Sequence, residues 1–265
     1  AGKVLFRDGV AGGTTSCAAC HINAGANADV TGSTPANRNF DTGIEQFLQN
    51  RLNDPTVTVV GEPRPVDGGF GTNPAGDFTT LLAQPGFENE NFGDLTFNTP
   101  SVIEAADTPP FFHNNAIATL EDSIRFYNSI EFQQASDMAI PFNEVQVAQV
   151  ANFLRVINAL DNIDNRILRQ ADRVLRALAH QPTPNAVIDR ILLIMINDVD
   201  DIRVVLNDGS LHNSGGLPEN AIKRLDQATK RLQQAMNTNA SVNARAHHIE
   251  VAEEELLAVR GLLRY

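Results

Sequence analysis

Four apolar stripes at helical spacing run through the C-terminal part of the chain, and they constrain its fold more than any other feature. In each stripe an apolar residue returns every three or four positions, as on one face of an α-helix. The stripes are Ile163–Leu178, Val187–Ile202, Ile222–Met236 and Ile249–Leu263. Breaks rich in Pro, Gly and Asn separate them, at 181–184, 207–218 and 237–241. Amphipathic helices joined by such short links predict an antiparallel four-helix bundle over 163–265.

Residues 1–162 form a different kind of domain. All 14 Phe and both Cys lie in this part of the chain, and 60–78 is full of turn-forming Pro, Gly, Asn and Asp. Helical patterns here are fewer, at 41–52, 119–130 and 143–160, with Thr119 expected to cap the second. The sequence therefore predicts a mostly α protein with two domains, a loop-rich one over 1–162 and the bundle over 163–265.

Acidic residues are concentrated in the first of these domains. The net charge of the chain is -12, with 7 Lys and Arg against 19 Asp and Glu in 1–163 and 13 of each after it. This balance argues against nucleic acid as a partner. An acidic surface attracts a basic protein partner, and it also favours solubility. The sequence contains no apolar run long enough for a transmembrane segment.

The two cysteines, Cys17 and Cys20, stand in a C-x-x-C-H motif that ends at His21. This spacing is the attachment signature of c-type haem. Each thiol forms a thioether with one vinyl group of the macrocycle, and the histidine becomes an axial ligand of the iron. Because this attachment takes place outside the cytoplasm, we expect an exported, periplasmic or otherwise extracytoplasmic protein. No signal segment stands at residue 1, so we expect a mature or trimmed form.

Three other uses of a Cys pair fit the sequence less well. A structural zinc site needs about four ligands, and the chain has one pair of thiols. A redox pair of the thioredoxin kind belongs on a strand-to-helix turn of an α/β fold, which the surrounding pattern does not predict. A disulfide would explain the cysteines but not the histidine beside them.

The second axial ligand of the iron decides the function of a haem protein. A sulfur ligand raises the reduction potential and suits electron transfer, whereas an open face suits peroxide chemistry. Met195 and Met236 lie on apolar helical stripes, where packing explains them. Met138 stands in a stretch expected to be a loop, just before the helix at 143–160, and is our candidate for the axial ligand.

Several phrases around the motif resemble the C-terminal haem domain of the bacterial di-haem cytochrome c peroxidase and MauG-type family. The resemblance covers roughly residues 2–160. Its phrases are GKVLF (Gly2–Phe6), NFDTGI (Asn39–Ile44), FNTPSV (Phe97–Val102), TPPFFHNN (Thr108–Asn115), ATLEDSIRFY (Ala118–Tyr127), Met138 and VANFLRVINAL (Val150–Leu160).

The resemblance implies a cytochrome c-like, mostly helical domain with long loops and one His/Met haem. It implies Met138 as the distal ligand, and it places Pro100 and Phe112 among the residues that bind the cofactor. His113 would pack near the haem without ligating the iron; a loop histidine bonded to the backbone is the alternative. In the family, this domain receives electrons from a small donor protein and passes them to a second, peroxidatic haem.

The chain departs from the family pattern at several points. It has one C-x-x-C-H, no Trp, and Val102-Ile103-Glu104 where the family has Leu-Arg-Asn. We therefore expect one haem, no catalytic residue of a peroxidase, and no N-terminal peroxidatic domain in this chain.

The expected function is one-electron transfer to a redox protein, which the acidic surface would suit if that partner is basic. One alternative is a part of a di-haem peroxidase or MauG-like oxidase, reducing hydrogen peroxide with a second haem on another chain or segment. Another is an assembly module whose bundle binds a partner or forms an oligomer.

Overall fold

A computed structural model describes residues 1–24, 39–52, 97–180, 185–208 and 217–264, and these are mostly helical. The turn-rich stretch at 60–78 lies outside the described residues. The chain packs as two compact units. The first comprises 1–102 and 108–151, and the second comprises 103–107 and 152–265.

Short helices and loops make up the described part of the first unit. Its elements are α1 (Gly2–Asp8), α2 (Cys17–Cys20), the 3₁₀ turn η1 (Ile22–Ala24), β1 (Asn39–Phe40), α3 (Ile44–Leu52), β2 (Phe97–Asn98), α4 (Leu120–Phe126), α5 (Ile130–Ser136) and the start of α6 (Glu144–Asp161). The two strands pair antiparallel, with Asn39 opposite Asn98 and Phe40 opposite Phe97.

Serine and threonine caps define where α4 and α5 begin. The Thr119 side-chain oxygen accepts a hydrogen bond from the Asp122 N–H at 3.1 Å, which confirms the predicted cap. The helix expected to reach residue 130 ends earlier, at Phe126, and α5 starts anew after Ser129, whose Oγ accepts from the Phe132 N–H. The stretch before Met138 was expected to be a loop, but 133–136 is helical because the Ser129 side chain caps the start of α5.

An aromatic cluster forms part of the core of the first unit. Phe126 is 2% exposed, and its ring centroid lies 4.9 Å from that of Phe112, 5.2 Å from that of Phe47 and 6.2 Å from that of Phe132. The rings meet edge to face, the arrangement that aromatic quadrupoles favour. The cluster thus joins α3, α4 and α5 to the loop that carries Phe112.

The second unit is built from long helices. It contains the turn η2 (Ala105–Asp107), the rest of α6, the π-helical segment η3 (Asn162–Ile167), α7 (Leu168–Ala179), α8 (Asn185–Asn207), α9 (Leu217–Ala235) and α10 (Val242–Leu263). Helix α6 continues through η3 into α7 without a break. The division between the units lies inside α6, between Ala151 and Asn152, and not at the expected 162/163. The expected boundary rested on the change of composition near residue 162. No Pro or Gly interrupts the helix there, so that change does not coincide with a break between the units.

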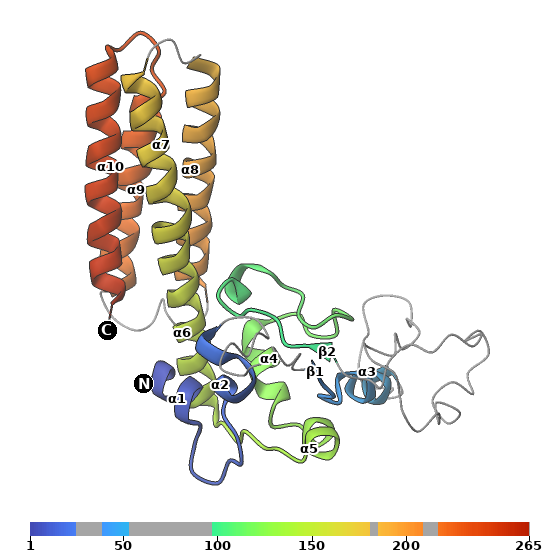
Figure 1. Cartoon of the computed structure of the whole chain (residues 1–265). Coiled ribbons are helices and arrows are strands. Elements are labelled where there is room, and N and C mark those ends of the chain that lie inside the picture. Colours follow the sequence, from blue (N-terminus) through green and yellow to red (C-terminus); the bar gives the residue numbers. More distant parts are fainter. Residues whose placement is uncertain (25–38, 53–96, 181–184, 209–216, 265) are drawn as a thin grey trace, which may run out of the picture. The chain divides into compact units, whose positions relative to one another are not determined.

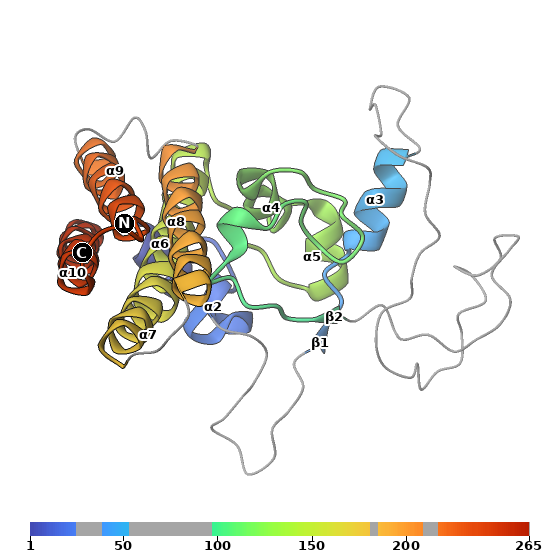
Figure 2. The same ribbon diagram turned by 90° about the horizontal axis from the view of Figure 1, so that it is seen from above.

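Helices α7, α8, α9 and α10 pack around one apolar core. Each contacts the next along the chain, and α10 also contacts α7. Figure 1 shows the four side by side along their lengths, and Figure 2 shows them foreshortened, from above. The predicted stripes Ile163–Leu178 and Ile249–Leu263 are buried throughout. Val187 is 49% exposed, so that part of the prediction was wrong; the buried face of α8 begins at Ile188 instead.

A buried arginine links three helices of this core. The Arg245 side chain is 3% exposed, and its guanidinium donates to Asp189 Oδ1, Asn185 Oδ1 and the Ala235 carbonyl. These partners compensate much of the cost of burying the charge. Across the described residues, the helices are too short or too polar to span a bilayer.

Candidate haem-binding site

One turn of helix presents the C-x-x-C-H motif. The Ala19 N–H donates to the Ser16 carbonyl, and the His21 N–H donates to the Cys17 carbonyl at 2.9 Å. Residues three apart on a helix lie on the same side, so Cys17 and Cys20 are neighbours and His21 follows directly. Both cysteines are half-buried. The turn therefore offers two thiols and an imidazole from a single short segment.

The His21 imidazole is buried and held in one orientation. The residue is 8% exposed, and its Nδ1 donates a hydrogen bond of 2.9 Å to the Pro100 carbonyl. Since a carbonyl can only accept, this bond places the ring proton on Nδ1 and leaves Nε2 as the atom with the free lone pair. Burial lowers the pKa of His21, with the bond to Pro100 opposing that shift in part. The neutral ring is thus favoured, and neutral imidazole is the form that binds metals.

The segment around Pro100 is tied to the same turn by further bonds. The Val102 N–H donates to the Ala24 carbonyl at 3.0 Å, and the Ser101 hydroxyl donates to the same oxygen at 3.3 Å. Three bonds thereby connect 100–102 with 21–24. The position of Pro100 beside His21 is consequently fixed by the fold of the whole segment.

Tyr127 is a residue of this site that the sequence reasoning missed. Burial is the main cause that raises the pKa of its phenol, and the nearby Cys17 and Cys20 raise that pKa further. Burial likewise raises the pKa of the Cys17 thiol to about 12. The phenol therefore lies near the thiol pair. Tyr127 is the last residue of the phrase Ala118–Tyr127 that resembles the peroxidase family, but nothing in that phrase marked it as a residue of the site.

Met138 lies in the loop between α5 and α6, close to the C-x-x-C-H segment in the fold. Helix α5 ends at Ser136, its C-cap residue Asp137 has a left-handed φ of 54°, and the Met138 N–H donates to Ser136 Oγ at 3.2 Å. The Ile140 N–H donates to the Tyr127 carbonyl, and the Thr14 N–H donates to the Ala139 carbonyl. The loop with Met138 is therefore bonded both to the residue beside the thiols and to the chain just before Cys17.

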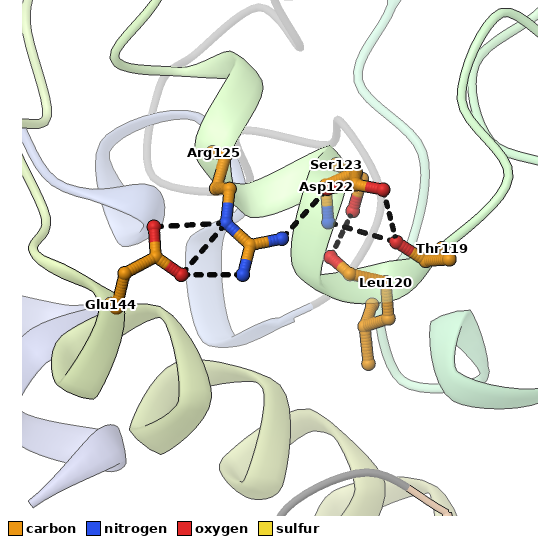
Figure 3. Close-up of polar contacts among 6 residues, drawn as sticks. All are labelled: Thr119, Leu120, Asp122, Ser123, Arg125 and Glu144. Atoms are coloured by element: carbon orange, nitrogen blue, oxygen red, sulfur yellow. Dashed lines mark hydrogen bonds and ion pairs between the residues drawn. The ribbon is translucent and has the colours of Figure 1, made fainter.

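An ion-pair network links α4 to the first residue of α6, directly after this loop. Figure 3 shows Arg125 of α4 between Glu144, the first residue of α6, and Asp122. Arg125 Nη2 lies 2.5 Å from Glu144 Oε2, and Nη1 lies 2.7 Å from Asp122 Oδ1. The bond with Arg125 lowers the pKa of Glu144; the pKa of Asp122 is lowered first by its bond with Thr119 and then by Arg125.

Phe112 and His113 are adjacent in sequence but belong to different surroundings. Phe112 belongs to the aromatic cluster, and its ring centroid lies 6.2 Å from that of Tyr127. The His113 ring stacks on Phe97 with centroids 3.5 Å apart, and its Nε2 meets Glu45 Oε1. Glu45, 4% exposed, is a second residue that the sequence did not single out.

The predicted site residues thus fall into two groups. The structure brings Cys17, Cys20, His21 and Pro100 together. The loop that carries Met138 is joined to this group by its hydrogen bonds with Thr14 and Tyr127. Phe112 joins this group through Tyr127, whereas His113 is held by Glu45. Within the described ranges, His, Cys, Asp and Glu form no group of three or more placed to hold a metal ion.

No family model, no curated protein and no solved structure is significantly similar to this chain.

Proposed function

We propose that the protein is a c-type cytochrome that transfers single electrons through one covalently attached haem. The observation that carries the proposal is the buried His21, which follows the Cys17/Cys20 turn and is oriented by the Pro100 carbonyl. In this proposal the two thiols form the thioethers and His21 Nε2 is one axial ligand. A c-type haem would supply a reversible one-electron change at its iron.

The donor set suits this group better than it suits a solvent-exposed metal. The turn supplies two thiols on one face, and burial keeps His21 in the neutral form that has a lone pair to donate. The carbonyl of Pro100 makes that imidazole a stronger donor, since a hydrogen bond at one ring nitrogen raises the basicity of the other. The thiol pair and Tyr127 are half-buried, which limits the access of water to the same region.

Met138 is proposed as the second axial ligand. Its support is the set of bonds that ties its loop to Thr14 and Tyr127. A thioether ligand favours the reduced state of iron and keeps other molecules off the metal, which suits electron transfer better than peroxide reduction. The chain's own part in the function is to hold this sulfur in place and to exclude water around it.

The wider assignments rest on the sequence. We propose a cytochrome c-like first unit related to the C-terminal domain of the di-haem peroxidase family, an antiparallel four-helix bundle as the second, and an extracytoplasmic location. The described helices α7 to α10, packed around one core, support the bundle. The net charge of -12, all of it in 1–163, supports a basic redox protein as partner, because opposite charges speed the encounter of two proteins.

The absorption spectrum of the haem-loaded chain tests the proposal. We expect the oxidised protein to show the weak far-red band of an iron–sulfur bond, and Met138→Ala to abolish it. Met195→Ala is the matched control, because Met195 is fully buried in the helical core and should leave the band unchanged.

A different spectrum would favour the peroxidase alternative. If the unmodified chain lacks the far-red band, has a high-spin haem and reacts with hydrogen peroxide, Met138 is not a ligand and electron transfer is not the function. A second haem recovered with the purified complex would point the same way.

A further inference from the structure

Two segments far apart in sequence meet beside Met138. The Thr14 N–H donates to the Ala139 carbonyl at 3.0 Å, and the Ala139 N–H donates to the Thr14 side-chain oxygen Oγ1 at 2.9 Å. A single residue thus satisfies both backbone groups of Ala139. Thr14 precedes Cys17 by three positions, and Ala139 directly follows Met138, so this pair of bonds links the two candidate ligand segments.

Gly13 lets the two segments approach this closely. A Cβ at position 13 would lie 3.1 Å from the Ala139 carbonyl oxygen and 3.2 Å from Pro141 Cδ. Both distances are tighter than ordinary van der Waals contact, so a larger residue would push the Met138 loop outward. Close packing at Gly13 and the hydrogen bonds of Thr14 therefore both position the same stretch, 139–141.

We infer that Thr14 is a positioning residue that holds Met138 as an axial ligand. This inference rests on the proposed function, because it concerns the same iron site. The Thr14 hydroxyl fixes the backbone directly after Met138, and the Ser136 bond fixes the Met138 N–H itself. Of these, the Thr14 bond is the one that connects the loop to the haem-attachment segment.

The chemistry of the side chain sets the expected size of the effect. Thr14 is exposed, so replacing it does not open a cavity in the core. One neutral hydrogen bond contributes about 0.5–1.5 kcal/mol net, which corresponds to about a 2- to 10-fold change in an equilibrium. The bond from the Thr14 N–H to Ala139 and the bond from Ile140 to Tyr127 remain after the hydroxyl is removed. The loop should therefore detach more often but not permanently.

Competition with imidazole measures how often Met138 leaves the iron. Added imidazole binds ferric iron only when the methionine has detached, so its apparent affinity reports the detached fraction. In the haem-loaded full chain we expect Thr14→Val to raise that affinity about 2- to 10-fold. Thr14→Ser, which keeps the hydroxyl, should match the unmodified chain. Gly13→Ala, with the hydroxyl intact but the segment pushed away, should shift the affinity in the same direction as Thr14→Val.

Two controls separate positioning from general destabilisation. Thr15→Val makes the same chemical change one position later and should leave imidazole affinity unchanged. Met138→Ala gives the upper limit, because nothing then competes for the iron. The urea midpoint of unfolding, measured on every variant, should shift little for Thr14→Val.

The outcomes also separate this inference from the proposal it rests on. If Met138→Ala binds imidazole tightly while Thr14→Val and Gly13→Ala both match the unmodified chain, Thr14 has no positioning role and the haem proposal stands. If the unmodified chain already binds imidazole as tightly as Met138→Ala, Met138 is not the ligand, and both the His/Met proposal and the inference are overturned.

Discussion

At the scale of single residues, contacts between distant segments decide the geometry of the site. His21 and Pro100 are 79 positions apart, and Thr14 and Ala139 are 125 apart. The C-x-x-C-H motif can be recognised from the sequence alone, because the two thiols and the imidazole that bind one haem must be close together in the chain. The partners of these residues leave no such local pattern. Tyr127, Glu45 and Thr14 were therefore not predictable as site residues from the sequence.

Gly43 is a residue whose backbone conformation should be required by the fold. It has a left-handed φ of 72°, and a Cβ there would lie 2.7 Å from the carbonyl carbon of Glu131 on α5. Gly12 is a matched control, because its φ is 86° but nothing in the described part of the chain lies within 4 Å of such a Cβ. The two sites share the backbone strain and differ only in the steric clash.

Urea unfolding should resolve this difference. We expect Gly12→Ala to lower the free energy of unfolding by about 1–2 kcal/mol, the cost of a left-handed alanine. Gly43→Ala should lower it by about 2–5 kcal/mol, because overpacking adds to the same strain. Equal losses at the two positions would show that α3 and α5 can separate freely around Gly43.

At the scale of elements, periodicity predicted the long helices better than their ends or their junctions. The stripe along η3 and α7 and the stripe on α10 are buried as expected, because helical spacing places such residues on one face. On α8 the prediction failed at Val187, since Val187 and Ile188 are both apolar and spacing alone does not choose between them. Helix α5 was overlooked because its start depends on the Ser129 cap rather than on an apolar stripe.

The Arg125 network connects α4 to α6 and should make stability depend on pH. The pKa values of Asp122 and Glu144 are lowered from their ordinary 3.8 and 4.5. A carboxyl whose pKa is lower in the folded state stabilises the fold above its ordinary pKa, and that stabilisation is lost as pH falls through the folded value. We expect Arg125→Gln to lower the free energy of unfolding at pH 7, and the difference from the unmodified chain to shrink below about pH 4.5.

Unfolding at pH 7 and pH 3 measures that effect. Arg7→Gln is the control, because Arg7 pairs with its neighbour Asp8 on α1 and joins no two elements; its effect at pH 7 should be smaller. A loss for Arg125→Gln that is the same at both pH values would contradict an electrostatic origin.

At the scale of the whole molecule, composition predicted two dissimilar parts. The boundary between them differs from the predicted one, because a continuous helix runs through both positions. Aromatic and turn-forming residues gather in the first part, and regular apolar stripes in the second. The division at 151/152 lies inside an uninterrupted helix, where neither a Pro nor a Gly marks it. Most of the net negative charge, both cysteines and all candidate ligands lie in the first unit, so the proposed function belongs to that unit.

The intact mass of the full chain tests the central claim most directly. The chain should be produced with the machinery that attaches c-type haem, then denatured and weighed. The account predicts that each chain keeps one haem after denaturation, and that the Cys17→Ser/Cys20→Ser variant keeps none. A chain that carries no haem, or one that releases it on denaturation, would contradict covalent attachment through Cys17 and Cys20.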